Sequence, residues 1–119
     1  DVFDYLRQAR EAGDTYDLII LDPPKFASSH YHVDRAARAY KDINLNGLRL
    51  LRAGGQLLTF SCSGAIDTDL FQKIVAGAVI DSRRQAWALS RFGAGVDHPL
   101  LMTFPEGEYL KGLHLKLCD

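Results

Sequence analysis

Apolar and polar positions along the chain recur with two periods, one typical of helices and the other typical of strands. Helical spacing and capping residues predict three helices, over residues 2–12, over residues 34–51 and from the Asp67–Asp69 N-cap region to Ala78. Apolar or alternating runs predict strands over 16–21, 56–61, 86–92 and 109–118, with 100–104 as a short strand or an ordered loop. This order predicts an α/β fold with a mainly parallel sheet.

Local signals also predict where the elements end. Gly13 fits the C-cap of the first helix, and Gly54–Gly55 is expected to end the second, with Arg52 complementing the helix dipole. The four consecutive apolar residues Leu18–Leu21 fit a strand that is buried on both faces, as in a parallel sheet. That strand is expected to stop at Asp22, because the two prolines that follow cannot continue a central strand.

Composition narrows the class of protein. The 119 residues carry 14 Lys and Arg against 15 Asp and Glu, a net charge of -1, and 47% of them are hydrophobic. These values exclude a disordered tail, a coiled coil and a collagen-like chain. They also argue against a nucleic-acid binder that uses its whole surface, although they allow a local basic patch or a basic domain elsewhere.

The sequence shows neither a membrane-spanning segment nor a signal peptide, and its cysteines do not predict a metal site. No apolar run approaches the ~20 residues that span a membrane, and the first residues have no signal-peptide pattern. Cys62 and Cys118 form no CxxC pair, so zinc binding is unsupported. We therefore expect a reduced, cytoplasmic protein in which a cysteine is by default a small buried hydrophobe.

The chain lacks one part that a complete nucleotide-binding sheet needs. No GxGxxG loop follows a first strand, and the sequence opens abruptly, at a helix or at the tail of an unseen strand. A doubly wound domain would have further strands on the N-terminal side. We therefore expect residues 1–119 to be the C-terminal half of such a domain.

The first candidate site is the run LIILDPPK at residues 18–25. Ligands of open α/β sheets bind beyond the carboxyl ends of strands, where this run places Asp22. The prolines stiffen the turn, and a fixed carbonyl and carboxylate suit the amino or imino group of a flat base. The alternative is a proline turn that Asp22 merely caps; the full run favours the functional interpretation.

The second candidate site is the run LLTFSCSG at residues 57–64. It places Cys62 at the end of the next strand, on the same rim as Asp22, among small residues that leave space for a substrate. A thiolate there would be a soft nucleophile. The alternative is a buried structural cysteine, which is the interpretation we keep for Cys118.

The motifs DPPK, YKDINLNGLRLL, GGQLLTFSCSG, DHP and PEGEYLKG occur in this order. Together they resemble the bacterial 23S ribosomal RNA cytosine-5 methyltransferases that carry an N-terminal PUA domain, over nearly the whole chain. The resemblance implies a Rossmann-like fold that binds S-adenosylmethionine, 23S ribosomal RNA as partner and a PUA domain in the full-length chain. A homodimer is possible.

The resemblance also implies roles for individual residues. Asp1 matches the acid that approaches the adenine amino group of the cofactor, while the family's glycine-rich loop precedes it. Asp22 and Pro23 match the motif between cofactor and target base, and Cys62 matches the nucleophile. A large group of other RNA cytosine-5 methyltransferases has a further catalytic cysteine where this chain has Pro24, so any step that uses that cysteine must proceed differently here. The substrate or RNA contacts that we expect are Pro24, Lys25, Tyr40, Lys41 and Asn44.

Cytosine chemistry agrees with this assignment. Addition of a thiolate at C6 makes C5 enamine-like, so that C5 can attack an electrophilic methyl group. Asp22, protonated or hydrogen-bonded to N3 or the exocyclic amine, would stabilise the adduct. The base that removes the C5 proton is not assigned, and the target nucleotide must be single-stranded or flipped out.

The remaining candidates have two interpretations of similar weight. Tyr40, Lys41 and Asn44 either contact RNA and shape the pocket, or Tyr40 packs in the core while Lys41 is solvated. His98 is not assigned a catalytic role, and His30 and His32 are interpreted as loop residues.

Two other functions stay open. One is an amino-nitrogen methyltransferase that uses the Asp-Pro-Pro motif and needs no cysteine. The other is a non-catalytic RNA-binding module that keeps the fold. If the chain is part of a cytosine-5 methyltransferase, residues 1–119 alone are expected to be inactive, because the cofactor loop is absent.

Overall fold

The computed structural model describes residues 2–23, 33–93 and 110–119. These residues form, in chain order, α1 (Val2–Ala12), β1 (Tyr16–Leu21), α2 (Val33–Leu50), β2 (Leu51–Ser61), α3 (Thr68–Ser82), β3 (Ala86–Gly93) and β4 (Lys111–Leu117). The predicted order of helices and strands is confirmed. The expectations for Asp1, Pro24, Lys25, His30, His32, His98 and the segment 100–104 lie outside the described residues.

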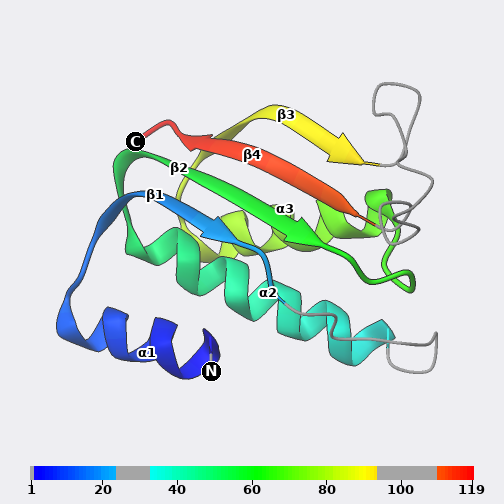
Figure 1. Cartoon of the computed structure of the whole chain (residues 1–119). Helices are drawn as coiled ribbons and strands as arrows, with labels where there is room; N and C mark the ends of the chain where they lie inside the picture. Colours follow the sequence, from blue (N-terminus) through cyan, green and yellow to red (C-terminus); the bar gives the residue numbers. More distant parts are fainter. Residues whose placement is uncertain (1, 24–32, 94–109) are drawn as a thin grey trace.

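The strands form one sheet, in the order β1-β2-β4-β3 (Figure 1). β1 and β2 are parallel, whereas β4 is antiparallel to both of its neighbours. Three of the described strands therefore point the same way, and the last strand in sequence inserts between β2 and β3 in the opposite direction. The predicted α/β fold, mainly parallel with an antiparallel closing strand, is confirmed.

All three helices lie on one face of the sheet (Figure 1). On that face β2 buries every second residue, among them Leu57 and Thr59, because alternate side chains of a strand point the same way. The predicted apolar stripe of α1 is also confirmed, since Leu6 and Ala9 are buried. The core of the described chain therefore lies between one face of the sheet and the helices.

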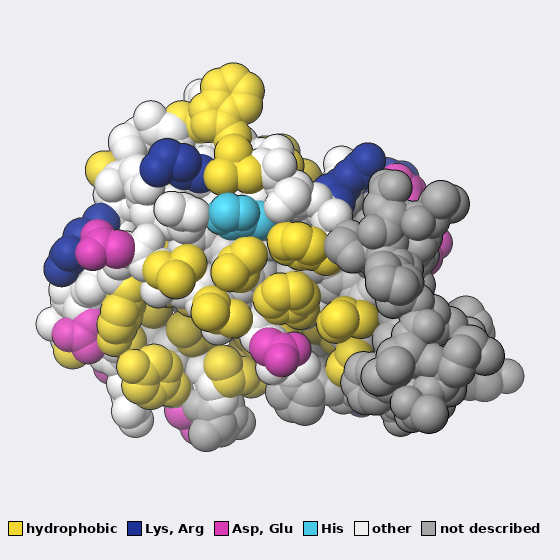
Figure 2. Space-filling model, turned by 45° about the horizontal axis from the view of Figure 1, so that its top comes forward, with side chains coloured by type: hydrophobic (Ala, Val, Ile, Leu, Met, Phe, Trp, Pro, Cys, Tyr) yellow, Lys and Arg dark blue, Asp and Glu magenta, His cyan; other side chains and the backbone are white. Residues whose placement is uncertain are grey.

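The opposite face of the sheet has no helix over it in the described chain. Leu18 and Ile20 of β1 are 52% and 59% exposed, and Trp87 of β3 is 66% exposed. Figure 2 shows hydrophobic side chains gathered over this face. The prediction that β1 is buried on both faces is therefore wrong for this chain, because nothing described covers its second face.

The junction between α2 and β2 also differs from the prediction. The helix ends at Leu50 and the strand begins at Leu51, so that Gly54–Gly55 lies inside β2. Pairing with β1 jumps from Leu51 to Gln56, and Gly54 supplies the positive φ of 75° in the irregular stretch between them. Arg52 forms an ion pair with Asp17 at 3.2 Å instead of complementing the dipole at the helix end.

No helix in the described residues is both long and apolar enough to cross a membrane.

Candidate active site

Asp22 and Cys62 follow two neighbouring parallel strands. Leu21, the last residue of β1, pairs with Thr59 of β2, and both strands end at the same edge of the sheet. The carboxylate of Asp22 is exposed at this edge, and Cys62 is partly buried. The two residues expected to act on a substrate therefore lie on one rim, where α/β sheets bind their ligands.

A cavity of about 300 Å³ opens beside Asp22. Its walls come from the start of α1, the end of β1 and the middle of α2, and its lining residues are Val2, Ile20, Leu21, Asp22, Pro23 and Ile43. One carboxylate among apolar side chains suits a flat heterocycle with an amino group at its edge. Asp1 itself is not described, but its neighbour Val2 lines the same cavity as Asp22 and Pro23.

Cys62 sits in a turn that is held by hydrogen bonds on both sides. The Ser61 Oγ accepts a hydrogen bond from the Ser63 backbone N–H at 3.3 Å. The Ser63 carbonyl accepts from the Ile66 N–H at 3.3 Å and from the Lys111 Nζ at 2.8 Å. Ser61, Ser63 and Ile66 are buried, so the backbone around the sulfur is fixed.

Lys111 is a residue of this site that the sequence analysis did not single out. Its side chain is 5% exposed, and burial lowers the pKa of its ammonium group, while attraction to the negative charges of Cys62 and Asp67 opposes that shift. The sequence did contain a signal for this residue. Side chains two positions apart in a strand point to the same face, so Lys111 is expected on the same face of β4 as the buried Leu113, Leu115 and Leu117.

The third group of expected substrate contacts lies mostly inside the protein. Tyr40 is 0% exposed and packs edge-to-face on Phe71, and Asn44 is 1% exposed and donates to the Tyr40 carbonyl at 2.8 Å. Lys41 is half-buried and forms an ion pair with Asp81 at 2.9 Å. The expectation that Tyr40 and Asn44 touch RNA directly is therefore corrected, because both side chains are buried and Tyr40 packs in the core against α3.

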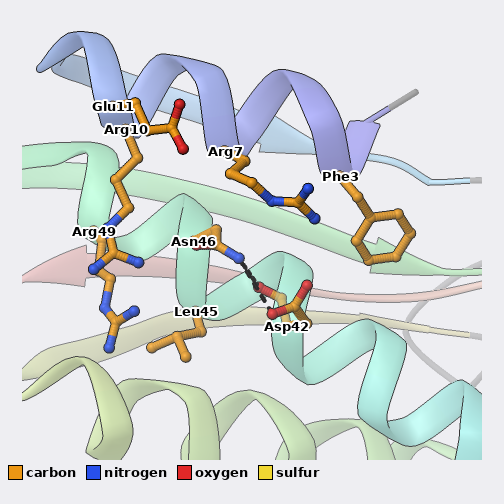
Figure 3. A pocket seen from close by; sticks show the side chains of 8 residues that line it. All are labelled: Phe3, Arg7, Arg10, Glu11, Asp42, Leu45, Asn46 and Arg49. Carbon is orange, nitrogen blue, oxygen red and sulfur yellow. Dashed lines mark hydrogen bonds between the residues drawn. The ribbon is translucent and has the colours of Figure 1, made fainter.

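A larger hollow, of about 470 Å³, lies between α1 and α2 (Figure 3). Its side chains are of mixed character, and they are Phe3, Arg7, Arg10, Glu11, Asp42, Leu45, Asn46 and Arg49. The Asn46 amide donates to the Asp42 carboxylate at 3.3 Å, as Figure 3 shows. None of the expected site residues that the structure describes lines this hollow, so size alone does not identify the site.

The two cysteines differ in their surroundings. Cys118 is exposed, so the expectation that it is a small buried hydrophobe is wrong; it follows the end of β4, where its backbone N–H donates to the Gln85 carbonyl at 2.8 Å. Within 2–23, 33–93 and 110–119, no group of three or more His, Cys, Asp or Glu side chains is arranged to hold a metal ion.

The chain is similar in sequence to curated bacterial proteins named ribosomal RNA large subunit methyltransferase I. It is 54% identical to the protein of Shewanella frigidimarina and 55% identical to that of Shewanella amazonensis, each over 113 residues, which is 95% of this chain and 28% of the relative. The protein of Photobacterium profundum is 53% identical over 112 residues, 94% of this chain and 28% of the relative. The chain thus spans 28% of the length of these relatives, and no family model matches it.

Solved structures show the same fold. SMU.776, a proposed methyltransferase in complex with SAH, superposes with a TM-score of 0.73 at 26% identity, over 98% of this chain and 30% of that one. A proposed SAM-dependent methyltransferase from Streptococcus mutans gives a TM-score of 0.69 at 26% identity, over 98% and 29%. The chain therefore has an α/β methyltransferase fold, and its sequence is similar to that of ribosomal RNA large subunit methyltransferase I.

Proposed function

We propose that this chain is part of a methyltransferase that transfers a methyl group from S-adenosylmethionine to C5 of a cytosine in 23S ribosomal RNA. The observation that carries the proposal is the placement of Asp22 and Cys62 after neighbouring parallel strands, on one rim of the sheet. The names of the relatives support a large-subunit ribosomal RNA as substrate. The SAH bound to SMU.776 supports the cofactor.

The cavity beside Asp22 fits the adenine end of that cofactor. Its apolar walls suit the faces of a flat ring, and Asp22 and Pro23 line it at the carboxyl end of β1. We assign Asp22, Pro23 and Asp1 to cofactor binding, with Asp1 directed to the adenine amino group. The cofactor supplies an electrophilic methyl group.

Cys62 acts as the nucleophile in this proposal. Its thiolate would form a bond to C6 of cytosine. The electron pair at C5 would then form the bond to the methyl group as the bond between that methyl and the cofactor's sulfur breaks, leaving S-adenosylhomocysteine. Asp22, hydrogen-bonded to N3 or the exocyclic amine, stabilises the charge on the ring. Loss of the C5 proton to a base then restores the ring's double bond, and the C6–S bond breaks to release Cys62.

RNA reaches this rim as a single strand or with its target nucleotide flipped out. Pro24 and Lys25, which follow the Asp22 turn, are assigned to RNA contact, and a PUA domain in the full-length protein supplies further contacts. Lys41 stays a predicted RNA contact; its half-buried ion pair with Asp81, in the last turn of α3, would have to open for it to bind a phosphate.

We further propose that residues 1–119 are the C-terminal portion of the catalytic domain. Sheets built mainly from parallel strands are normally covered by helices on both faces, and here Leu18, Ile20 and Trp87 lie uncovered on one. β1 is also an edge strand of the described sheet. A preceding segment that supplies strands beside β1 and helices over this face would complete the domain.

Methylation by cysteine variants of the full-length protein tests the function. We expect Cys62→Ala to abolish formation of 5-methylcytosine in 23S ribosomal RNA, measured by mass spectrometry of nuclease-digested RNA. Cys118→Ala, which removes the exposed cysteine, is the matched control and should retain wild-type activity. Full 5-methylcytosine formation by Cys62→Ala would make Cys62 structural and overturn the mechanism.

The same assay addresses the alternatives. An amino-nitrogen methyltransferase that uses Asp22-Pro23-Pro24 would yield a cytosine or adenine methylated on its amino group, and Cys62→Ala would leave that product unchanged. A non-catalytic RNA-binding module would yield no methylated nucleoside with the wild-type protein. Either result would contradict the proposed reaction.

A further inference from the structure

The first residue of β4 brings a lysine into the turn that carries Cys62. Lys111 pairs across the sheet with Ser61 of β2 and with Gly93 of β3, so it lies in the row of residues next to the carboxyl end of both strands. Its side chain is directed to the helix-covered side and is 5% exposed. Its Nζ donates to the carbonyl of Ser63, the residue directly after Cys62, at 2.8 Å.

Among the residues that the structure describes, this ammonium group has few charged neighbours. In the described part of the chain Lys111 forms no ion pair with a carboxylate. The titratable groups that act on it are Cys62, in the turn after β2, and Asp67, at the start of α3; its neighbours in the sheet, Ser61 and Gly93, are uncharged. Burying a cation without a paired carboxylate is unfavourable for folding, so stability alone does not explain a lysine here.

We propose that Lys111 is a positioning residue for Cys62: it ties down the turn through the carbonyl of Ser63, the next residue, and the positive charge that it holds at that carbonyl favours the thiolate. A nearby cation is one of the features that make a cysteine reactive. The inference rests on the proposed function only in that the thiolate is taken to attack cytosine. The reactivity of Cys62 itself can be measured without RNA or cofactor.

The test is the rate of alkylation of Cys62 in the full-length protein between pH 6 and pH 10. Iodoacetamide forms an S–C bond with the thiolate and releases iodide, and peptide mass spectrometry follows Cys62 and the exposed Cys118 separately in the same sample. We expect Lys111→Met to slow alkylation of Cys62 about tenfold at pH 7 and to move the midpoint of its pH profile upward by about one unit. Lys111→Arg, which keeps the charge, should restore most of the rate, and Cys118 should not change.

A second variant predicts the opposite sign and leaves the lysine in place. Asp67 caps α3 by accepting from the Leu70 N–H at 2.7 Å, and asparagine caps helices equally well. Asp67→Asn therefore keeps the helix start but removes the negative charge that competes with Cys62 for Lys111. We expect its Cys62 to be alkylated faster at pH 7, with the midpoint of the pH profile moved downward.

The outcomes separate this inference from a merely structural role and from the proposed function. A looser turn would change the alkylation rate of Cys62 by the same factor at every pH, and an unmoved midpoint in both Lys111→Met and Asp67→Asn would overturn the inference. The proposed function would be untouched by that result. Conversely, shifted midpoints together with full methylation by Cys62→Ala would support the role of Lys111 while overturning the proposed function.

Discussion

Gly112 shows how a single residue shapes the uncovered face of the sheet. The ring of Phe60, on the neighbouring strand β2, lies across it and stacks on Phe92 of β3, with ring centroids 6.1 Å apart. A Cβ added at Gly112 would come within 2.5 Å of the Phe60 Cδ1. Only glycine therefore allows the aromatic pair to bridge β4, directly beside Lys111.

We expect Gly112→Ala to lower the free energy of unfolding of the full-length protein by about 2 kcal/mol, because the Phe60 ring must leave its position. The measurement is urea unfolding followed by circular dichroism. Gly77→Ala is the matched control: its Cβ would meet the flexible Lys41 side chain at 3.5 Å, and alanine inside α3 should raise stability by about 0.5–1 kcal/mol. Equal effects of the two substitutions would contradict the packing described for Phe60.

At the scale of elements, the C-terminal end of α2 is held by an arginine from a distant segment. Arg84, between α3 and β3, donates to the Leu48 carbonyl at 2.7 Å and also to the Leu51 carbonyl. It forms an ion pair with Asp119 at 3.1 Å, and its side chain is only 16% exposed. Arg84 therefore supplies the cation at the helix end that the sequence analysis expected from Arg52.

We expect Arg84→Met to destabilise the full-length protein by about 2–3 kcal/mol, because two carbonyl groups lose a charged donor. Arg52→Met is the matched control. Its ion pair with Asp17 is exposed, with side chains 57% and 80% accessible, so its loss should cost less than about 1 kcal/mol. Thermal or urea unfolding measures both, and a control that is as unstable as Arg84→Met would remove the special role given to Arg84.

These elements also show what the sequence can predict. The bounds of α1 and β1, and the Asp67 cap of α3, follow from local periodicity and capping residues, and all three are confirmed. The start of β2 at Leu51 depends on pairing with β1, and the contact of Arg84 with α2 joins residues more than thirty positions apart. Local patterns contain no information about such tertiary contacts.

The same division holds for the candidate site. Asp22 and Cys62 could be placed on one rim because each ends an apolar strand, and adjacent parallel strands end together. The burial of Tyr40 and Asn44 could not be resolved, because an amphipathic helix does not reveal how wide its buried face is. Lys111 was not identified as a site residue, although its position two residues before Leu113 places it on the buried face of β4.

At the scale of the whole molecule, the sheet has one covered and one uncovered face. The exposed hydrophobic side chains of β1 and β3 include Leu18, Ile20, Trp87 and Leu89, each more than half exposed (Figure 2). Apolar patches of this kind mark a surface that another segment or protein covers. We propose that the preceding part of the catalytic domain covers these side chains.

We therefore expect residues 1–119, produced alone, to bind the hydrophobic dye ANS more strongly per mole than the full-length protein, because the face over β1 and β3 stays open. The same fragment should form no 5-methylcytosine when incubated with S-adenosylmethionine and 23S ribosomal RNA. The full-length protein, assayed in parallel, is the control. Methylation by the fragment alone would show that residues 1–119 form a complete catalytic unit.

The central claim is that Cys62 forms a covalent bond to C6 of the target cytosine. The most direct measurement is to incubate the full-length protein with S-adenosylmethionine and RNA that contains 5-fluorocytosine, whose C5 fluorine blocks release of the cysteine. We expect a protein–RNA adduct that survives denaturation and that mass spectrometry locates at Cys62, with no adduct in Cys62→Ala. An adduct at Cys118, or methylation without any adduct in the wild-type protein, would contradict it.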